Sequence, residues 1–310
     1  MSPDNSSTVR SFGGSYIGRR RNNEDSLGKR EPGDPELRRR RGSLYVVCDG
    51  MGGHSAGEVA SRLGVETVLK EYYAGEGAPV ESLVAAVEKA NECIYQAAGE
   101  ELEREGMGCT VVACVVLEER AVIAHVGDSR VYLLRHGELK LLTRDHLHIT
   151  EEMGVAQEEA KKHHLRHMLS RALGRGREVK VDTQTLAWEA GDRLLLCTDG
   201  LSNALTEAEL AAGLSEPTPR EAVARLLEQA EASQAEDNSS GIVVALLAPE
   251  PTVEETPAAA ETPPEPGPVT APEPPSAEAA PAAAEAAPRE APPSPGLVRR
   301  WLRGLRRRES

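Results

Sequence analysis

The chain has 310 residues and a formal net charge of −14, with 36 basic and 50 acidic residues. An acidic protein is a poor general binder of nucleic acid, so we expect no nucleic-acid partner. Its N-terminus, MSPDNSSTVR, lacks the apolar core of a signal peptide, and no apolar run approaches the roughly 18 residues needed to span a bilayer. The five cysteines form no CxxC pair, which favours free thiols in a reducing compartment. We therefore expect a cytoplasmic protein.

The composition changes abruptly near Pro249. Fifteen of the 21 prolines lie in 249–295, mixed with Ala and Glu and with a single basic residue, Arg289. Such a segment buries too little apolar surface to offset its ordering entropy, so we expect a disordered linker there. Residues 1–248 then form one domain with a charge of −11, because 249–295 carries −8 and 296–310 carries +5.

Apolar runs rich in aliphatic residues predict six strands. In chain order they are 44–48, 110–117, 121–126, 131–134, 193–197 and 242–247. The two-residue turn His136-Gly137 predicts a hairpin and therefore antiparallel pairing. Capping boxes predict the starts of three helices, at Ser55/Glu58, Thr206/Glu209 and Thr218/Glu221. Pro79 opens a further long helix. Helices in blocks beside clustered strands indicate an α+β domain built on antiparallel sheets.

Four aspartates lie next to a small residue at the end of a short apolar strand. Three of them directly follow the strand, and the fourth, Asp237, precedes it. They are Asp49 in YVVCDGMGGH, Asp128 in IAHVGDSR, Asp199 in RLLLCTDG and Asp237 in EDNSSGIVV. An Asp at a strand end is rigidly placed, and an adjacent Gly lets backbone carbonyls approach a ligand. Any one Asp-Gly pair also marks an ordinary turn. Four such acids with few His beside them indicate a site for Mg²⁺ or Mn²⁺ rather than Zn²⁺.

Together the motifs resemble the metal-dependent protein phosphatase family (PPM, type 2C), in its compact bacterial form. The resemblance covers roughly 10–247 and rests on RRNNED, DGMGGH, AHVGDSRVYLLR, LTRDH, SRALG, GDRLLLCTDGL and DN. It implies an antiparallel β-sandwich flanked by helices on both faces, in four layers αββα, with the metals in a cleft at one sandwich edge. It also implies a serine/threonine phosphatase that uses two Mn²⁺ or Mg²⁺ ions, with a third bound more weakly. A hydroxide that bridges the metals would attack the phosphorus.

The resemblance assigns metal-binding roles position by position. Asp49 matches the residue that bridges both metals, and the Gly50 carbonyl matches a ligand of the second. Asp199 and Asp237 match the remaining ligands of the first metal. The acids that bind waters of the second metal match Glu24 and, less closely, Asp25, while Asp128 with Asp199 matches the ligands of the third.

Two further residues are candidates for the chemistry. Arg20 matches the arginine that grips the phosphate, although Arg19 and Arg21 are adjacent and a shift of one position is open. A serine or threonine alkoxide is a poor leaving group and needs a proton. His54, beside the metal motif, is our candidate for that general acid, and the alternative is a helix-capping or supporting histidine.

Substrates and rivals follow from the same resemblance. We expect a monomer that dephosphorylates phosphoproteins, including bacterial Ser/Thr kinases and their substrates. A phosphatase for phosphotyrosine or a small metabolite is one rival. A catalytically dead phosphopeptide-binding protein is another, although its usual mark, the loss of a metal ligand, is absent from the sequence.

Three other features leave alternatives open. His163, His164 and His167 have helical spacing and fit a polar helix in the flap that the family carries beside its active site, or a zinc site. The run 38–41 is four arginines in an expected loop, either a solvated charge run or a recruiter of acidic substrates. The segment 296–310 predicts a basic amphipathic helix containing Trp301, suited to an anionic membrane surface or to an acidic protein, and the further alternative is that it has no ordered role.

Overall fold

The computed structural model describes residues 8–52, 56–156, 159, 163 and 168–247. The chain divides into two units, 1–252 and 253–310, and the second lies outside the described residues. The expected linker 249–295 and helix 296–310 therefore also lie outside them. Within the described part of the first unit, no helix is long and apolar enough to cross a membrane.

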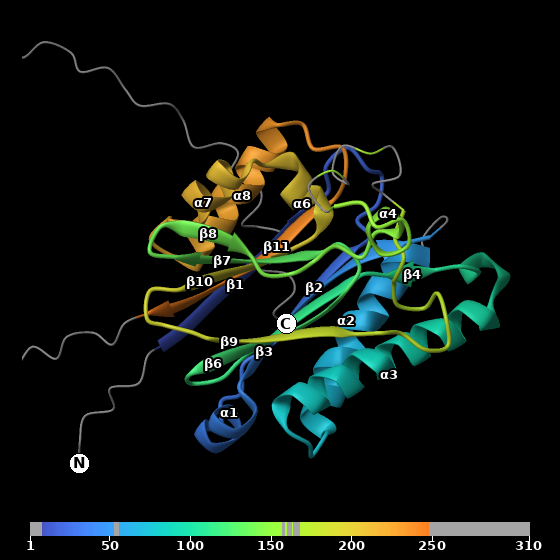
Figure 1. Cartoon of the computed structure of the whole chain (residues 1–310), viewed down its shortest axis with the longest axis horizontal. Coiled ribbons are helices and arrows are strands. Elements are labelled where there is room, and N and C mark those ends of the chain that lie inside the picture. The colour runs from blue at the N-terminus through green and yellow to red at the C-terminus, as the bar shows by residue number, and fades with distance from the viewer. Residues whose placement is uncertain (1–7, 53–55, 157–158, 160–162, 164–167, 248–310) are drawn as a thin grey trace, which may run out of the picture. The chain divides into compact units, whose positions relative to one another are not determined.

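Two antiparallel sheets form the centre of this unit (Figure 1). The first has the strand order β1 (Thr8–Tyr16), β11 (Ser239–Leu247), β10 (Arg193–Cys197), β7 (Arg130–Arg135) and β8 (Glu138–Leu141). The second has the order β2 (Asp25–Arg30), β3 (Ser43–Met51), β5 (Val111–Val116), β6 (Arg120–Val126) and β9 (Asp182–Ala187), and β4 (Gly108–Cys109) pairs with the end of β3.

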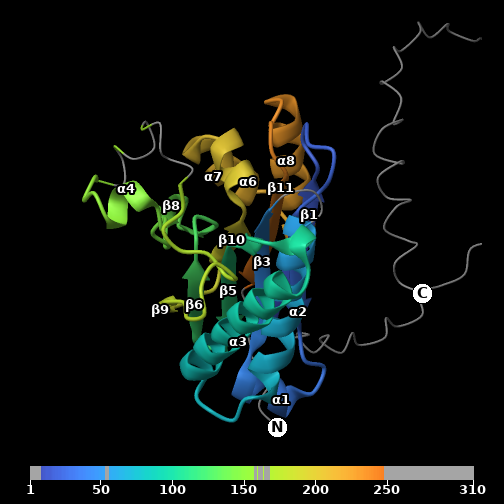
Figure 2. The same cartoon turned by 90° about the vertical axis from the view of Figure 1, so that its right-hand side faces the viewer.

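Helices cover the outer faces of both sheets (Figures 1 and 2). The second sheet is covered by α2 (Ala56–Ala74) and α3 (Pro79–Glu100), and the first by α6 (Asp199–Ala204), α7 (Glu207–Leu214) and α8 (Pro219–Ala232). Among the described residues, three short helices lie in connections, namely α1 (Pro35–Arg41), η1 (Leu102–Arg104) and α4 (His148–Glu151). The expected four-layer αββα architecture is confirmed.

Alternation of side chains along each strand builds three apolar layers. In β10, Leu194 and Leu196 pack between the sheets, while Leu195 and Cys197 pack under α6–α8. In β3, Tyr45 lies between the sheets and its neighbours face α2 and α3. A strand buried on both faces must be apolar at every position, which is why these strands read as continuous apolar runs.

The elements expected from apolar runs are present. All six strands appear within three residues of their expected bounds, with the largest differences at the end of β3 and the start of β11. His136 and Gly137 both have positive φ, 52° and 83°, as a two-residue hairpin turn requires. The capping boxes at Thr206 and Thr218 are formed, whereas Ser55 lies outside the described residues. Four of the five cysteines are buried free thiols, as expected.

The expectation of a loop at 38–41 is wrong, because these arginines complete helix α1. Asp34 caps the helix by accepting a hydrogen bond from Glu36 N, and Pro35 occupies its first turn. Basic residues in the last turn suit the negative end of the helix dipole. The run is also not uniformly solvated, since Arg41 is buried, stacks on Tyr72 and donates to carbonyls near the end of α2.

Candidate metal centre

Five carboxylates gather at one end of the sandwich. The pKa of Asp49 is raised well above its usual value, first by burial and then by the charges of Asp25, Asp199, Asp128 and Asp237. Four of these acids stand at strand ends that the sequence had marked, two in each sheet. The two sheets therefore bring together, at one edge, aspartates that lie up to 212 positions apart in the sequence.

Asp25 lies directly opposite Asp49 in the pairing of β2 with β3. Side chains paired in this way point to the same face of the sheet. Thr198 Oγ1 donates to Asp25 Oδ2 at 3.0 Å, while the buried Oδ1 has no hydrogen-bond partner among the described residues. Burial, and then the charges of Asp199 and Asp237, raise the pKa of Asp25 to about 7. A buried carboxylate oxygen without a partner beside a second carboxylate is the arrangement that a divalent cation would complete.

Asp128 stands in a loop that is tied to the strand of Asp49. Its pKa is raised to about 8, first by burial and then by the charges of Asp199 and Asp145. The next residue, Ser129, shares a 2.7 Å hydrogen bond with Thr110, whose hydroxyl also accepts from Asp49 N at 3.0 Å. Thr110 thus ties the Asp128 loop to the Asp49 strand.

Gly50 and Glu24 are held against the start of α2. Gly50 N donates to Glu24 O at 3.1 Å, and a Cβ added at Gly50 would lie 2.1 Å from Gly57 O. Only glycine therefore fits at this position. The Glu24 carboxylate also packs on Gly57, and its pKa is raised, with burial as the largest cause.

Arg20, rather than Arg19, points into the acidic cluster. Its guanidinium forms a 2.6 Å ion pair with Asp237 and interacts electrostatically with Glu24 and Asp49, whereas Arg19 donates to Gln234. Both side chains of the Arg20–Asp237 pair are exposed, at 57% and 42%. A pair exposed to this degree stabilises the fold little and can be exchanged for another partner.

Asn238 is a positioning residue that the sequence reasoning missed. Its side-chain amide is buried, donates to Ile17 O at 2.7 Å and to Asn22 O at 3.1 Å, and accepts from Glu24 N at 2.8 Å. It therefore holds the loop that carries Arg20 from both ends. The available signal was the DN motif, which places Asn238 beside Asp237 but says nothing of its partners.

His54 lies outside the described residues, as do His164 and His167. The structure therefore assigns no position to the candidate acid. The remaining candidates, Glu24, Asp49, Gly50, Asp128, Asp199, Asp237 and Arg20, converge on the same edge of the sandwich. An oxygen-rich donor set of this kind fits Mg²⁺ or Mn²⁺.

Comparison with known proteins agrees with this geometry. The model of the family described as Protein phosphatase 2C matches residues 13–239. The chain is 35% identical over 235 residues to the serine/threonine phosphatase Stp of Listeria innocua, covering 73% of this chain and 90% of that protein. It is 38% identical over 205 residues to PstP of Mycobacterium tuberculosis, covering 64% of this chain and 40% of that protein.

Solved structures share the architecture. The crystal structure of the M. tuberculosis serine/threonine phosphatase PstP/Ppp superposes with a TM-score of 0.66 at 35% identity, covering 77% of this chain and 99% of that one. A PstP catalytic domain in complex with two manganese ions gives a TM-score of 0.65 at 34% identity, covering 77% and 98%. Stp1 from Staphylococcus aureus gives 0.68 at 29% identity, covering 78% and 96%.

Proposed function

The chain belongs to the protein phosphatase 2C family of metal-dependent serine/threonine phosphatases, and we propose that its catalytic centre is the acidic cluster around Asp49. One observation carries this proposal. Asp49 is surrounded by four other carboxylates, and the buried Asp25 Oδ1 among them has no hydrogen-bond partner in the described part of the chain. Like charges at this density destabilise a fold unless cations are bound between them.

In the proposed centre, Asp49, Gly50, Asp199 and Asp237 hold two Mn²⁺ or Mg²⁺ ions. Glu24 and Asp25 hold water around the second, and Asp128 with Asp199 supplies a third site. Bound ions supply a water of lowered pKa and a Lewis acid for the phosphoryl oxygens.

Arg20 is the proposed phosphate ligand. A guanidinium can bind two phosphate oxygens at once, and charge-assisted hydrogen bonds of this type are stronger than neutral ones. In the structure Arg20 is paired with Asp237 in an exposed ion pair. A substrate phosphate can therefore replace this contact without uncovering a buried charge. The proton for the leaving alkoxide is assigned to His54, on the sequence argument alone.

The proposed substrates are phosphoserine and phosphothreonine in proteins, among them bacterial Ser/Thr kinases and the proteins that they phosphorylate. The relatives support this by name, as serine/threonine phosphatases. We further propose a cytoplasmic monomer, since one chain supplies every residue assigned above. Peripheral contact with the inner membrane surface through 296–310 is the proposed role of the C-terminal segment.

Release of phosphate from a phosphothreonine peptide in the presence of Mn²⁺ tests the proposal. We expect Asp49→Asn and Asp199→Asn each to lower the rate by about 100-fold or more, because each substitution removes a proposed metal ligand. Asp34→Asn is a matched control, since Asn caps a helix as well as Asp does. Full activity in both site variants would refute the centre. Faster turnover of a phosphotyrosine peptide or a sugar phosphate would refute the substrate class alone.

A further inference from the structure

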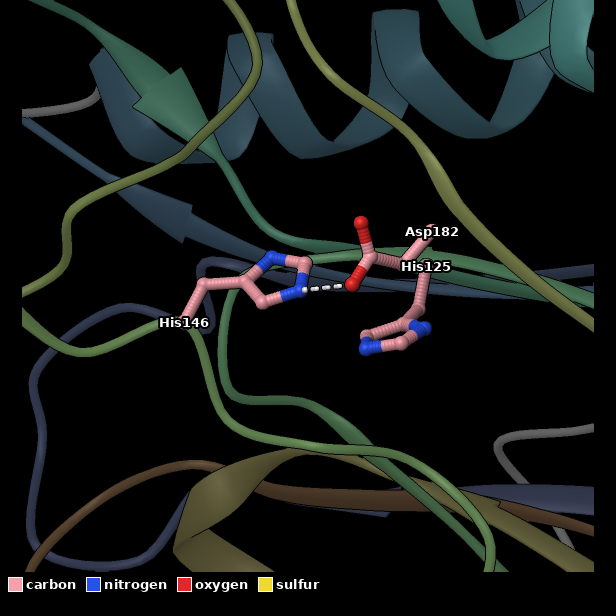
Figure 3. Close-up of side chains that lie close together, drawn as sticks. All are labelled: His125, His146 and Asp182. Atoms are coloured by element: carbon pink, nitrogen blue, oxygen red, sulfur yellow. Dashed lines mark hydrogen bonds and ion pairs between the residues drawn. The ribbon is translucent and has the colours of Figure 1, made fainter. Parts of the chain in front are cut away.

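A second polar cluster, formed by His125 of β6, His146 of the loop before α4, and Asp182 of β9, contacts the residue that precedes Asp128 (Figure 3). One nitrogen of each ring and a carboxylate oxygen lie within 4.8 Å of one another. The rings, however, are stacked, with centroids 4.6 Å apart and planes 25° apart. Imidazole lone pairs lie in the ring plane, so two nearly parallel rings do not direct their nitrogens to one ion. Hydrogen bonding explains the cluster better than metal binding does.

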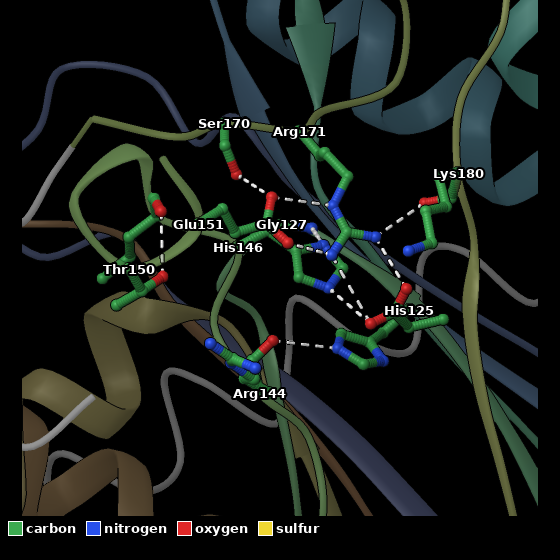
Figure 4. Close-up of polar contacts among 11 residues, drawn as sticks. His125, Gly127, Arg144, His146, Thr150, Glu151, Ser170, Arg171 and Lys180 are labelled. Atoms are coloured by element: carbon green, nitrogen blue, oxygen red, sulfur yellow. Dashed lines mark hydrogen bonds and ion pairs between the residues drawn. The ribbon is translucent and has the colours of Figure 1, made fainter. Parts of the chain in front are cut away.

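The ring of His146 is hydrogen-bonded on both edges (Figure 4). Gly127 N donates to His146 Nδ1 at 3.1 Å, so Nδ1 carries no proton and Nε2–H donates to Asp182 Oδ2 at 3.3 Å. The main chains are joined as well, since His146 N donates to Gly127 O at 3.0 Å. Burial, and then the charges of His125 and Arg171, lower the pKa of His146 to about 4, which keeps this tautomer at neutral pH.

Gly127 has little freedom to move away from His146. Its φ is +106°, and a Cβ added there would lie 2.6 Å from the Thr110 side chain. The peptide that leads into Asp128 is thus confined between the His146 ring and Thr110. A displacement of His146 would therefore be passed to Asp128, the next residue along the chain.

On its other edge, His146 is connected to α4. Asp182 Oδ1 accepts from Arg171 Nη1 at 2.7 Å, and Arg171 forms a two-pronged ion pair with Glu151, the last residue of α4. The main chain just before α4 is also held, because His146 O accepts a hydrogen bond from Ser170 N at 3.0 Å. Figure 4 shows these contacts running from α4 to the Gly127 peptide.

We infer that His146 is a positioning residue that fixes the Asp128 carboxylate through Gly127 and is itself oriented, through Asp182 and Arg171, by α4. The inference rests on the proposed function, because it gives Asp128 a part in catalysis. The two ring nitrogens then have different roles. Nδ1 positions the Asp128 loop by accepting from Gly127 N, and Nε2 connects the ring to α4 by donating to Asp182.

Two substitutions separate these tasks. Asn places its amide oxygen near the position of Nδ1, so His146→Asn keeps the acceptor for Gly127 N and loses the contact with Asp182. Gln reaches the position of Nε2, so His146→Gln keeps the contact with Asp182 and leaves Gly127 N without its acceptor. His136→Asn and His136→Gln are matched controls, because His136 is exposed in the β7–β8 turn.

We expect His146→Gln to lower kcat on p-nitrophenyl phosphate and on a phosphopeptide about tenfold, with little change in KM. Adding Asp128→Asn to His146→Gln should lower kcat little further. Adding it to His146→Asn should lower kcat by the same factor as in wild type. We expect His146→Asn to keep most of its kcat but to exchange the amide hydrogens of α4 faster. Equal losses of kcat in both variants, with α4 protected equally, would reduce His146 to a packing role and overturn the inference.

A measurement on the unmodified chain keeps the inference testable if a variant fails to fold. Nitrogen NMR of His146 in wild type should show an unprotonated Nδ1 and a protonated Nε2 between pH 6 and 8. The opposite tautomer would overturn the inference. Absence of Mn²⁺-dependent hydrolysis by wild type would instead refute the proposed function, and the tautomer and amide-exchange results would still decide the hydrogen-bond assignment.

Discussion

At the residue scale, the centre is a set of like charges held close together by the fold. Asp25 faces Asp49 across a strand pair. The charge of Asp25 raises the pKa of Asp49, and the charges of Asp199 and Asp237 raise the pKa of both. Thr198 donates a hydrogen bond to Asp25, and the Asp49 backbone N–H donates one to the Thr110 hydroxyl, so both groups are fixed in position. Such a site stores unfavourable electrostatic energy, which bound cations release.

This energy predicts that Asp25→Asn stabilises the metal-free protein at pH 8. The folded-state pKa of Asp25 is about 7, above its ordinary value of 3.8, so the folded state retains the proton that the unfolded chain loses. Ionised Asp25 therefore opposes folding increasingly as pH rises from 3.8 to about 7, and by a constant amount above that. At about 1.4 kcal/mol per pKa unit, the gain in unfolding free energy is up to about 4 kcal/mol at pH 8 and near zero at pH 4.

Urea unfolding of EDTA-treated protein at pH 4, 6 and 8 measures this gain, with Asp34→Asn as the control. Calorimetry on the same variant should show weaker Mn²⁺ binding, since a proposed holder of its water shell is lost. A gain that is the same at pH 4 and pH 8, or a loss of stability at pH 8, would contradict the electrostatic explanation.

The residues of the centre were predictable from sequence to different degrees. Asp49, Asp128 and Asp199 follow apolar strands, and this local pattern marks them. Asn238 and His146 have no such pattern, because their partners lie far along the chain. The amide of Asn238 binds Ile17 and Asn22, 221 and 216 positions away. Only the folded chain shows that a hydrogen bond joins two segments so distant in sequence.

At the element scale, buried strands were predictable from their apolar runs, whereas among the edge strands only β8 was predicted, through the His136-Gly137 turn. The strands β3, β5 and β10 are apolar on both faces because a layer covers each face. The unpredicted strands β1, β2 and β9 lie at sheet edges and are polar or glycine-rich. Exposed edge strands are commonly polar, because polar side chains discourage pairing with other chains. A polar strand has no apolar run by which it could be predicted from the sequence. The unpredicted β2 carries Asp25, so the missed strand is also part of the centre.

Helix α1 provides the element-scale prediction. The helix ends at Arg41, and β3 begins at Ser43. Asp49 lies six residues after Ser43 along that strand. At about 3.3 Å per residue, this separates the helix from the centre by roughly 20 Å, about twice the screening length at physiological salt. We therefore expect Arg39→Glu combined with Arg40→Glu to leave kcat/KM unchanged on acidic and neutral phosphopeptides alike.

A matched substitution in the same helix should act on stability instead. Arg41 is buried and donates to Gly77 O and Tyr72 O, so Arg41→Ala leaves carbonyl groups without donors. We expect a loss of about 2 kcal/mol or more in unfolding free energy, with unchanged kcat/KM in the folded fraction. A selective loss of activity on acidic peptides in the Arg39/Arg40 double variant would restore substrate recruitment as the role of this run.

At the scale of the whole molecule, the catalytic residues and the C-terminal segment are separate in the chain. Every residue assigned to the centre lies between 20 and 238, and β11, the last strand along the described chain, ends at Leu247. A chain that ends at residue 248 therefore contains the complete centre and both sheets. We expect its kcat/KM on p-nitrophenyl phosphate to be within about twofold of the full chain.

The same separation predicts that removal of 296–310 affects only the location of the enzyme. This segment has six Arg and Trp301, and each basic residue near an anionic bilayer contributes about 1 kcal/mol to binding. The full chain should co-sediment with phosphatidylserine vesicles at low salt, and the shortened chain should not. Trp301→Ala should weaken binding through lost apolar contact, while neutral phosphatidylcholine vesicles should bind neither chain well. Equal co-sedimentation of both chains would exclude membrane tethering through this segment and leave docking on an acidic protein, or no ordered role, as the alternatives.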